Sequence, residues 1–181
     1  MRNLVFILLS VATLLSCGTP EARRPVTVKT GSRIDESVAR NKERVAQEDA
    51  FLKKIIASDS VTWKASSDGF WYRYEIQDPT DSFTAQVGDQ VTFTYDIRDI
   101  NETMIYPASE NGVINYQIDQ DPRFSTFRGM REALKLLKVG ETVHFIFPSY
   151  TAYGYYGYED RIGSNMPLRS TITMISIENN N

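Results

Sequence analysis

The chain has 181 residues, of which 41% are hydrophobic and 24% charged, a composition that suits one soluble domain with an appendage. The net charge of −3 and the lack of a basic cluster argue against nucleic-acid binding. One cysteine excludes an internal disulfide, and with only one histidine beside it the sequence predicts neither a metal centre nor a cofactor.

Residues 1–16 have the pattern of a secretion signal. A short positive start precedes an apolar run (4–15) that is too short to span a membrane as a helix. The sequence LLSCG at residues 14–18 resembles a bacterial lipobox, in which the cysteine is alkylated with diacylglycerol and becomes N-terminal. This resemblance implies that Cys17 is lipidated and that the protein is membrane-anchored in the cell envelope and faces the periplasm. The alternative is an ordinary signal peptide with an incidental cysteine.

A linker and a helix follow the signal. Residues 17–32 are rich in proline, glycine and threonine and predict a flexible linker that lifts the domain off the bilayer. Apolar residues then recur at helical spacing and predict a helix over 33–57, outside the main domain. Asn41 and Glu48 interrupt this stripe, which argues against a coiled coil. Two interpretations stay open: the helix packs on its own domain, or it offers a surface for a partner or for self-association.

Residues 70–177 predict one domain that is mostly strand. Alternating or β-prone segments occur at 70–76, 90–98, 114–116, 141–147 and 168–177. The polar, irregular stretch from Asn101 to Asn111 predicts a loop. Residues 128–138 predict the one short helix of this domain, which ends before Gly140. The fold class is therefore α+β.

The most unusual stretch is a tyrosine-rich segment between Tyr150 and Tyr158, where Gly154 and Gly157 separate the aromatic residues. It is too aromatic for a disordered segment and too rich in glycine for a strand. We predict a loop that displays aromatic rings beside an apolar surface. The alternative is a hydrophobic loop that covers a sheet edge.

Residues 140–165 resemble the C-terminal half of the FKBP-type peptidyl-prolyl isomerases. The matching elements are a Gly-Glu turn at 140–141, a strand, Pro148, the sequence AYG at 152–154, Gly157 and Ile162. Phe127 to Leu134 resembles the helix motif of the same family. With the lipoprotein leader, the chain looks most similar to the gliding-motility-associated FKBP lipoproteins of gliding bacteria. The resemblance implies an antiparallel sheet of about five strands wrapped around a short helix.

The resemblance also implies an isomerase that acts on proline-containing polypeptides. Rotation about a peptide bond makes and breaks no covalent bond, so the site needs only an apolar cradle that favours the twisted amide. The implied catalytic residue is Tyr153 of the AYG sequence, whose hydroxyl in the family donates a hydrogen bond to a substrate carbonyl. The other implied substrate-binding residues, each of which is alternatively explained as core packing, are Tyr95, Tyr116, Phe127, Met130, Tyr158 and Ile162.

Several positions depart from the family pattern. Asp96 stands where a glycine is usual, Met130 where many members have tryptophan, and Ser170 where a phenylalanine often closes the pocket. No acid aligns near Ile105 and Tyr106, where most active members carry a Phe-Asp pair. Two functions stay open: a folding catalyst for envelope proteins of a gliding motility or secretion apparatus, with full or reduced activity, and a non-catalytic binding or chaperone module on a membrane-anchored lipoprotein.

Overall fold

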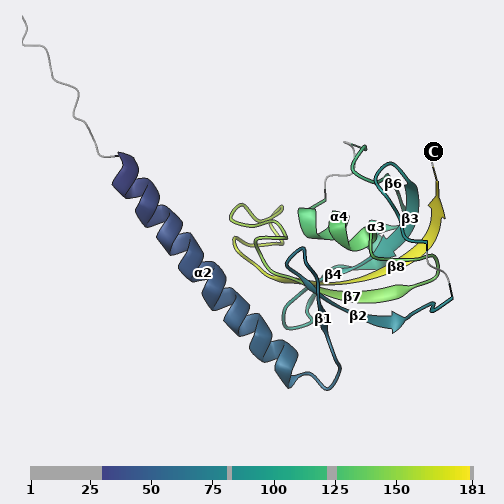
Figure 1. Ribbon diagram of the computed structural model, residues 1–181, viewed down its shortest axis with the longest axis horizontal. Coiled ribbons are helices and arrows are strands. Elements are labelled where there is room, and N and C mark those ends of the chain that lie inside the picture. The colour runs from purple at the N-terminus through teal and green to yellow at the C-terminus, as the bar shows by residue number, and fades with distance from the viewer. Residues whose placement is uncertain (1–29, 81–82, 122–125, 180–181) are drawn as a thin grey trace, which may run out of the picture. The chain divides into compact units, whose positions relative to one another are not determined.

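The computed structural model describes residues 30–80, 83–121 and 126–179 (Figure 1). Cys17, the predicted signal peptide and most of the predicted linker lie outside these residues. The chain divides into two units at Arg40–Asn41, and the second unit, Asn41–Asn181, contains the second half of the long helix and every strand described.

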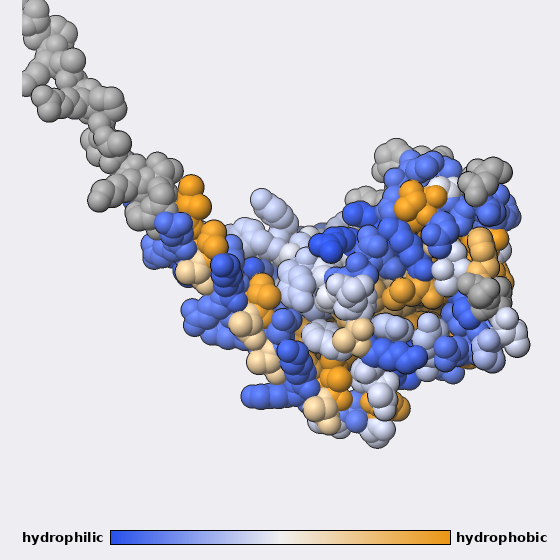
Figure 2. Space-filling view, viewed as in Figure 1, coloured by the Kyte–Doolittle hydropathy of each residue, from blue (hydrophilic) through white to orange (hydrophobic). Residues whose placement is uncertain are grey.

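The long helix, α2, extends over Thr30–Ser58, so it begins inside the predicted linker. In the second unit its Leu52 is fully buried, and the carboxylate of Glu48 accepts hydrogen bonds from the backbone N–H and the hydroxyl of Ser149. This half of the helix therefore packs on its own domain. Figure 2 shows hydrophobic residues along one line of α2, and Ile34 and Val38 are exposed. Among the described residues, no helix combines the length and apolar character that a membrane span requires.

The described strands form a single sheet in the order β1-β2-β7-β8-β3-β6, with β4 paired to β8 and β5 paired to β4. Every pairing is antiparallel, which confirms the predicted α+β class. The bounds are β1 Lys64–Ala65, β2 Trp71–Ile76, β3 Gln90–Tyr95, β4 Ile97–Asp99, β5 Met104–Tyr106, β6 Ile114–Gln117, β7 Thr142–Phe147 and β8 Leu168–Glu178.

The sheet has more strands than the five that the sequence predicts. The additional strands β1, β4 and β5 have only two or three residues each, which is too short for an alternating pattern to be recognised. The loop predicted over Asn101–Asn111 is wrong in part, because it contains β5 and a short helix, α3 (Ala108–Asn111).

The strand predicted over 90–98 is interrupted at Asp96, which separates β3 from β4. The backbone N–H of Asp96 donates to the carbonyl oxygen of Thr171 at 3.1 Å, and its carboxylate accepts from the backbone N–H of Thr171 at 2.7 Å. A side-chain carboxylate thus takes the place of a backbone carbonyl at this break, which is why β8 continues unbroken past it.

Figure 1 shows α4 (Arg128–Leu134) against one face of the sheet, and the core residues of the sheet and of α4 fill the space between them. On β7, Val143, Phe145 and Phe147 face this core, where they meet Met130 and Leu134 of α4. Because successive strand residues point to opposite faces, the residues between them reach the other face of the sheet. The sheet therefore offers two chemically distinct faces.

Candidate functional site

The tyrosine-rich segment leaves β7 through a tight turn and is held by its own hydrogen bonds. The carbonyl oxygen of Pro148 accepts from the backbone N–H groups of Thr151 and Ala152 at 3.0 and 3.1 Å. Further along, Tyr158 and Ile162 exchange two backbone hydrogen bonds of 2.9 and 3.1 Å. The segment is thus the predicted loop, with a fixed backbone that sets where its rings lie.

Two glycines allow this backbone to form. Gly157 has φ +67°, and a Cβ there would lie 2.2 Å from the carbonyl oxygen of Ile162. Gly129 of α4 donates its N–H to the carbonyl oxygen of Thr151 at 2.8 Å, and a Cβ there would lie 2.7 Å from the ring of Phe147. The loop, the helix and β7 can approach this closely only because neither position carries a side chain.

The rings that the loop displays form a continuous aromatic wall. Tyr153 and Tyr158 are stacked, with ring centroids 4.6 Å apart and an interplanar angle of 20°. Phe127 meets Tyr153 edge-on at 5.0 Å, and Tyr106 meets Tyr158 at 6.4 Å. Such pairs stabilise an arrangement of rings beyond the area that they bury.

This wall borders a cavity of about 260 Å³ on the α4 side of the sheet, which we call the tyrosine cavity. Of the predicted site residues, Tyr95, Tyr153 and Tyr158 line it. The other lining residues, which the sequence analysis did not assign to the site, are Ile97, Tyr106, Glu110, Asn111 and Glu159.

The remaining predicted site residues lie behind the lining. Phe127 is 5% exposed and supports Tyr153, while Ile162 is 2% exposed and pairs with Tyr158. Met130 and Tyr116 are fully buried in the core and do not line the cavity. The Tyr116 hydroxyl accepts a hydrogen bond from the backbone N–H of Asp119, so this phenol is engaged inside the domain.

The Tyr153 hydroxyl is a neutral donor in this cavity. Burial, reinforced by the phenols of Tyr95 and Tyr158, raises the pKa of Tyr153 well above its ordinary value of 10. Burial likewise raises the pKa of Tyr95. Within the part of the chain that the structure describes, the Tyr153 hydroxyl has no hydrogen-bond partner. It is therefore protonated at neutral pH and available to a carbonyl oxygen of a bound molecule.

A carboxylate does reach the cavity, from a segment where the sequence analysis did not look for one. Glu159, next to Tyr158 on the loop, accepts a hydrogen bond from the Tyr106 hydroxyl at 2.6 Å. Burial and this hydrogen bond raise the pKa of Tyr106 to about 12. The guanidinium of Arg161 lies 4.6 Å from the Tyr106 ring centroid and pairs with Glu110 at 2.7 Å. Tyr106 is thus held from two sides at the cavity rim.

The only signal for Glu159 in the sequence was its place beside Tyr158. Its backbone has φ +49°, an uncommon conformation for a residue with a side chain, which marks the tip of the hairpin. The contact with Tyr106 joins residues far apart in the chain, and no local pattern predicts it.

Chemically, the cavity combines aromatic walls, the neutral hydroxyl of Tyr153 and a polar rim. It can hold an apolar ring and a planar amide away from water. The carboxylates of Glu110 and Glu159 at its rim are engaged with Arg161 and Tyr106. Among the described residues, no group of three histidine, cysteine, aspartate or glutamate side chains is arranged to hold a metal ion.

Comparisons with known proteins point to a single family. Residues 82–175 match the family model described as FKBP-type peptidyl-prolyl cis-trans isomerase. A curated relative, the probable FKBP-type peptidyl-prolyl cis-trans isomerase FkpA of Neisseria meningitidis serogroup B, is 29% identical over 145 residues. The match covers 80% of this chain but 50% of that protein, so the chain spans about half the length of this relative.

Two solved structures share the fold. A peptidyl-prolyl cis-trans isomerase from Pseudomonas syringae pv. tomato matches with a TM-score of 0.60 and 19% identity, over 76% of this chain and 96% of that one. FkpA from Escherichia coli matches with a TM-score of 0.58 and 18% identity, over 98% of this chain and 81% of that one.

Proposed function

The chain belongs to the family of FKBP-type peptidyl-prolyl cis-trans isomerases, and we propose that it catalyses the rotation of X-Pro peptide bonds in the cavity lined by Tyr95, Tyr153 and Tyr158. The barrier to this rotation is about 18–20 kcal/mol, and the cis and trans forms before proline differ by only about 0.5–1 kcal/mol. A cavity that stabilises the twisted amide over both planar forms is sufficient for catalysis.

The free hydroxyl of Tyr153 is the observation that carries this proposal. A phenol without a partner in a half-buried aromatic cavity is expected to donate a hydrogen bond to a substrate carbonyl. The stacked Tyr158 ring and the Phe127 ring behind it fix the direction of the Tyr153 side chain. The proline ring would lie against the same aromatic wall, which keeps water away from the amide.

A protease-coupled assay with a proline-containing tetrapeptide tests the proposal. Tyr153→Phe keeps the aromatic wall and removes one neutral donor, worth about 0.5–1.5 kcal/mol, so kcat/KM should fall roughly two- to tenfold. Tyr156→Phe is the matched control, because it removes the same hydroxyl from a side chain that is 93% exposed. If the wild-type chain does not accelerate isomerisation above the buffer rate, the proposed activity is wrong.

We further propose that the protein acts in the cell envelope, anchored through lipid on Cys17 and facing the periplasm. The lipobox-like sequence at residues 14–18 supports this location. The similarity to gliding-motility lipoproteins suggests clients in a motility or secretion apparatus. Cys17→Ser should move the protein out of the membrane fraction and change its size; an unchanged fractionation and size would contradict the anchor.

A second candidate function is a non-catalytic binding or chaperone module. It is favoured by Tyr155 and Tyr156 of the tyrosine-rich segment (150–158), which we also call the tyrosine loop. These side chains are 72% and 93% exposed and able to contact an unfolded polypeptide. The exposed part of α2, with Ile34 and Val38, would be a surface for a partner or for self-association. This alternative predicts isomerase rates near background, with Tyr153→Phe altering only the affinity for a polypeptide.

A further inference from the structure

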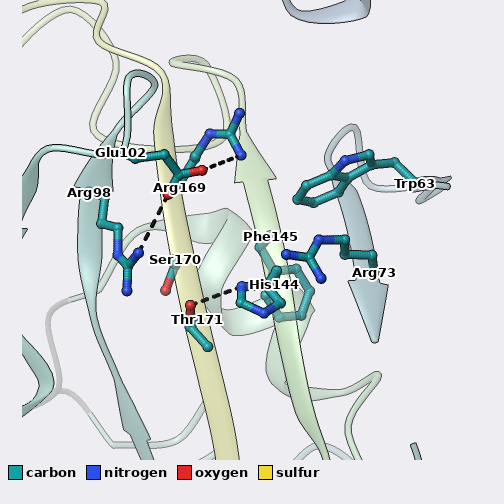
Figure 3. A pocket seen from close by; sticks show the side chains of 9 residues that line it. All are labelled: Trp63, Arg73, Arg98, Glu102, His144, Phe145, Arg169, Ser170 and Thr171. Carbon is teal, nitrogen blue, oxygen red and sulfur yellow. Dashed lines mark hydrogen bonds and ion pairs between the residues drawn. The ribbon is translucent and has the colours of Figure 1, made fainter. Parts of the chain in front are cut away.

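A second pocket, of about 110 Å³, lies on the sheet face that points away from α4 (Figure 3). We call it the arginine pocket and define it by Trp63, Arg73, Arg98, His144, Arg169 and Thr171. Strand register builds it: Arg73 of β2 lies directly opposite His144 of β7, which lies opposite Thr171 of β8. Directly paired residues on one face have neighbouring side chains, so these three form a polar row across the sheet.

Two of the three arginines already have acidic partners. Arg98 and Arg169 lie directly opposite each other on β4 and β8, an arrangement that would repel without compensation. Glu102 provides it, with a carboxylate 2.7 Å from Arg169 and 3.5 Å from Arg98. Asp96 adds a second ion pair with Arg98 at 2.6 Å. The charges of Arg98 and Arg169 are therefore balanced within the protein.

The other acids near the pocket are also engaged. The Glu75 carboxylate lies 2.7 Å from His144 Nε2. On the other side of the ring, His144 Nδ1 lies 3.1 Å from the Thr171 hydroxyl. Asp59 accepts a hydrogen bond from the Trp63 indole at 2.9 Å, and this hydrogen bond lowers the pKa of Asp59. Neither carboxylate lies within ion-pair distance of Arg73, although the charge of Arg73 contributes to the lowered pKa of Asp59.

Arg73 is the exception. Its Nε is buried and has no hydrogen-bond partner, and across residues 30–80, 83–121 and 126–179 no carboxylate lies within ion-pair distance of it. Figure 3 shows its guanidinium between Trp63 and His144, and its central carbon lies 5.4 Å from the Trp63 ring. A charged donor that is buried without an acceptor is costly, so this position favours an incoming anion.

We propose that the arginine pocket binds a carboxylate through Arg73, either an acidic side chain or C-terminus of a polypeptide or a free small carboxylate. Arg73 is the one arginine of the pocket that pairs with no carboxylate among the described residues, and a single guanidinium matches one carboxylate better than a doubly charged phosphate. A guanidinium fork binds both oxygens of a carboxylate, and the Trp63 ring lies beside the guanidinium of Arg73. The site lies on the opposite sheet face from the tyrosine cavity and does not rest on the isomerase activity.

The test is a titration of the purified full-length chain with small anions. Binding is monitored through the nuclear magnetic resonance signal of the Trp63 indole N–H. This signal is assigned by Trp63→Phe, because the chain has only two tryptophans. The probes are acetate, acetyl-glutamate amide, acetyl-glutamine amide and phosphate, each against sodium chloride at equal ionic strength. We expect saturable shifts with acetate and with acetyl-glutamate amide, and none with acetyl-glutamine amide. A preference for acetyl-glutamate amide over acetate identifies a polypeptide source, and the reverse a free carboxylate.

Variants distinguish bidentate binding by the Arg73 guanidinium from a general effect of positive charge on the protein. Arg73→Met should weaken carboxylate binding about tenfold or more, whereas Arg73→Lys should lose less, because it keeps the charge without the fork. Arg40→Met, which removes one arginine from an exposed position on α2, should leave the affinity unchanged. Three outcomes would each overturn the proposal. They are an equal loss of affinity in Arg40→Met and Arg73→Met, the absence of a saturable shift in the wild-type chain, and tighter binding of phosphate than of either carboxylate.

Discussion

The tyrosine cavity and the arginine pocket use neighbouring residues of the same strand in opposite ways. Ile97 of β4 lines the tyrosine cavity, and the next residue, Arg98, lines the arginine pocket. The cavity on the α4 side contains neutral phenols whose pKa values are raised by burial. The pocket on the other side contains charges held by ion pairs. A strand can therefore serve two kinds of chemistry, because its period of two separates them by the thickness of the sheet.

The comparison also explains why the two sites should respond independently. The tyrosine cavity depends on ring packing with α4 and on the shape of the loop after β7. The arginine pocket depends on strand register and on the acids that compensate its charges. Changes in the aromatic packing should therefore reduce isomerase activity and leave carboxylate binding intact in the molecules that remain folded.

The largest effect is expected from Phe127→Ala. This side chain is 5% exposed and lies 5.0 Å, centroid to centroid, from both Phe147 and Tyr153. Its removal should lower the free energy of unfolding by about 3–5 kcal/mol, as for other buried phenylalanines. Chemical denaturation measures the loss, and kcat/KM should fall more than for Tyr153→Phe because Tyr153 loses its support.

Phe51→Ala is the control for this substitution, because it truncates the same residue type at a position that is 48% exposed. It should change the free energy of unfolding by less than about 1 kcal/mol. If folded Phe127→Ala protein lost carboxylate binding at the arginine pocket as well, the independence of the two faces would be disproved.

Gly157→Ala should have the next largest effect. The added Cβ would lie 2.2 Å from the Ile162 carbonyl oxygen, at a backbone φ of +67°. Overpacking and left-handed strain together should cost about 2–4 kcal/mol in the free energy of unfolding. The stack of Tyr153 on Tyr158 should also shift, which would lower kcat/KM and leave the Trp63 signal unchanged.

Gly140→Ala isolates the strain from the overpacking. Gly140 has φ +81°, but a Cβ there would meet nothing within 4 Å. We expect a loss of only about 1–2 kcal/mol and no change in kcat/KM. Equal losses from both substitutions would show that contact with Ile162 does not shape the loop.

The sequence predicted those features that depend on residues close together in the chain. Alternation identified β7 and β8, and the resemblance of Phe127 to Leu134 to the family's helix motif indicated α4, because each of these signals is local in the chain. The AYG sequence led to Tyr153 and Tyr158, two of the residues that line the cavity.

What the sequence missed is produced by tertiary contacts. The Glu159 carboxylate contacts Tyr106 although the two residues are 53 positions apart in the chain. The sequence analysis looked for an acid only next to Ile105 and Tyr106 and therefore did not find it. Arg73 and His144 are far apart in the sequence, and only the register of β2 against β7 brings them side by side. The family resemblance implied that Met130 and Tyr116 bind substrate, whereas the fold places both in the core behind the cavity.

A smaller effect is expected from Glu48→Gln, which tests the anchor of the tyrosine loop. The Glu48 carboxylate binds the backbone N–H of Ser149 and, at 2.6 Å, its hydroxyl, where the loop leaves β7. Glutamine keeps the shape but removes the charge, which should weaken these bonds by about 1 kcal/mol. Hydrogen exchange at the Ser149 amide should accelerate roughly fivefold.

The control for Glu48→Gln is Glu43→Gln on the same helix, where the carboxylate is exposed and accepts a hydrogen bond from Gln47. Exchange at Ser149 should not change in this variant. An equal acceleration in both variants would mean that helix charge, rather than the contact with Ser149, controls the loop.

The smallest effect is expected from pH. Burial raises the pKa of Tyr153 above 10, so its hydroxyl stays a donor, and kcat/KM should be flat from roughly pH 6 to 9. Tyr106 has a pKa of about 12 in the folded protein against an ordinary value of 10. Because the unfolded chain releases this proton first as pH rises, the stability from neutral Tyr106 is complete below pH 10 and is lost between 10 and about 12. Alkaline unfolding of the wild-type chain and of Tyr106→Phe measures this loss of stability, which should be smaller in Tyr106→Phe. For the activity, a fall in kcat/KM already near pH 8 would mean that a group other than these phenols controls the tyrosine cavity.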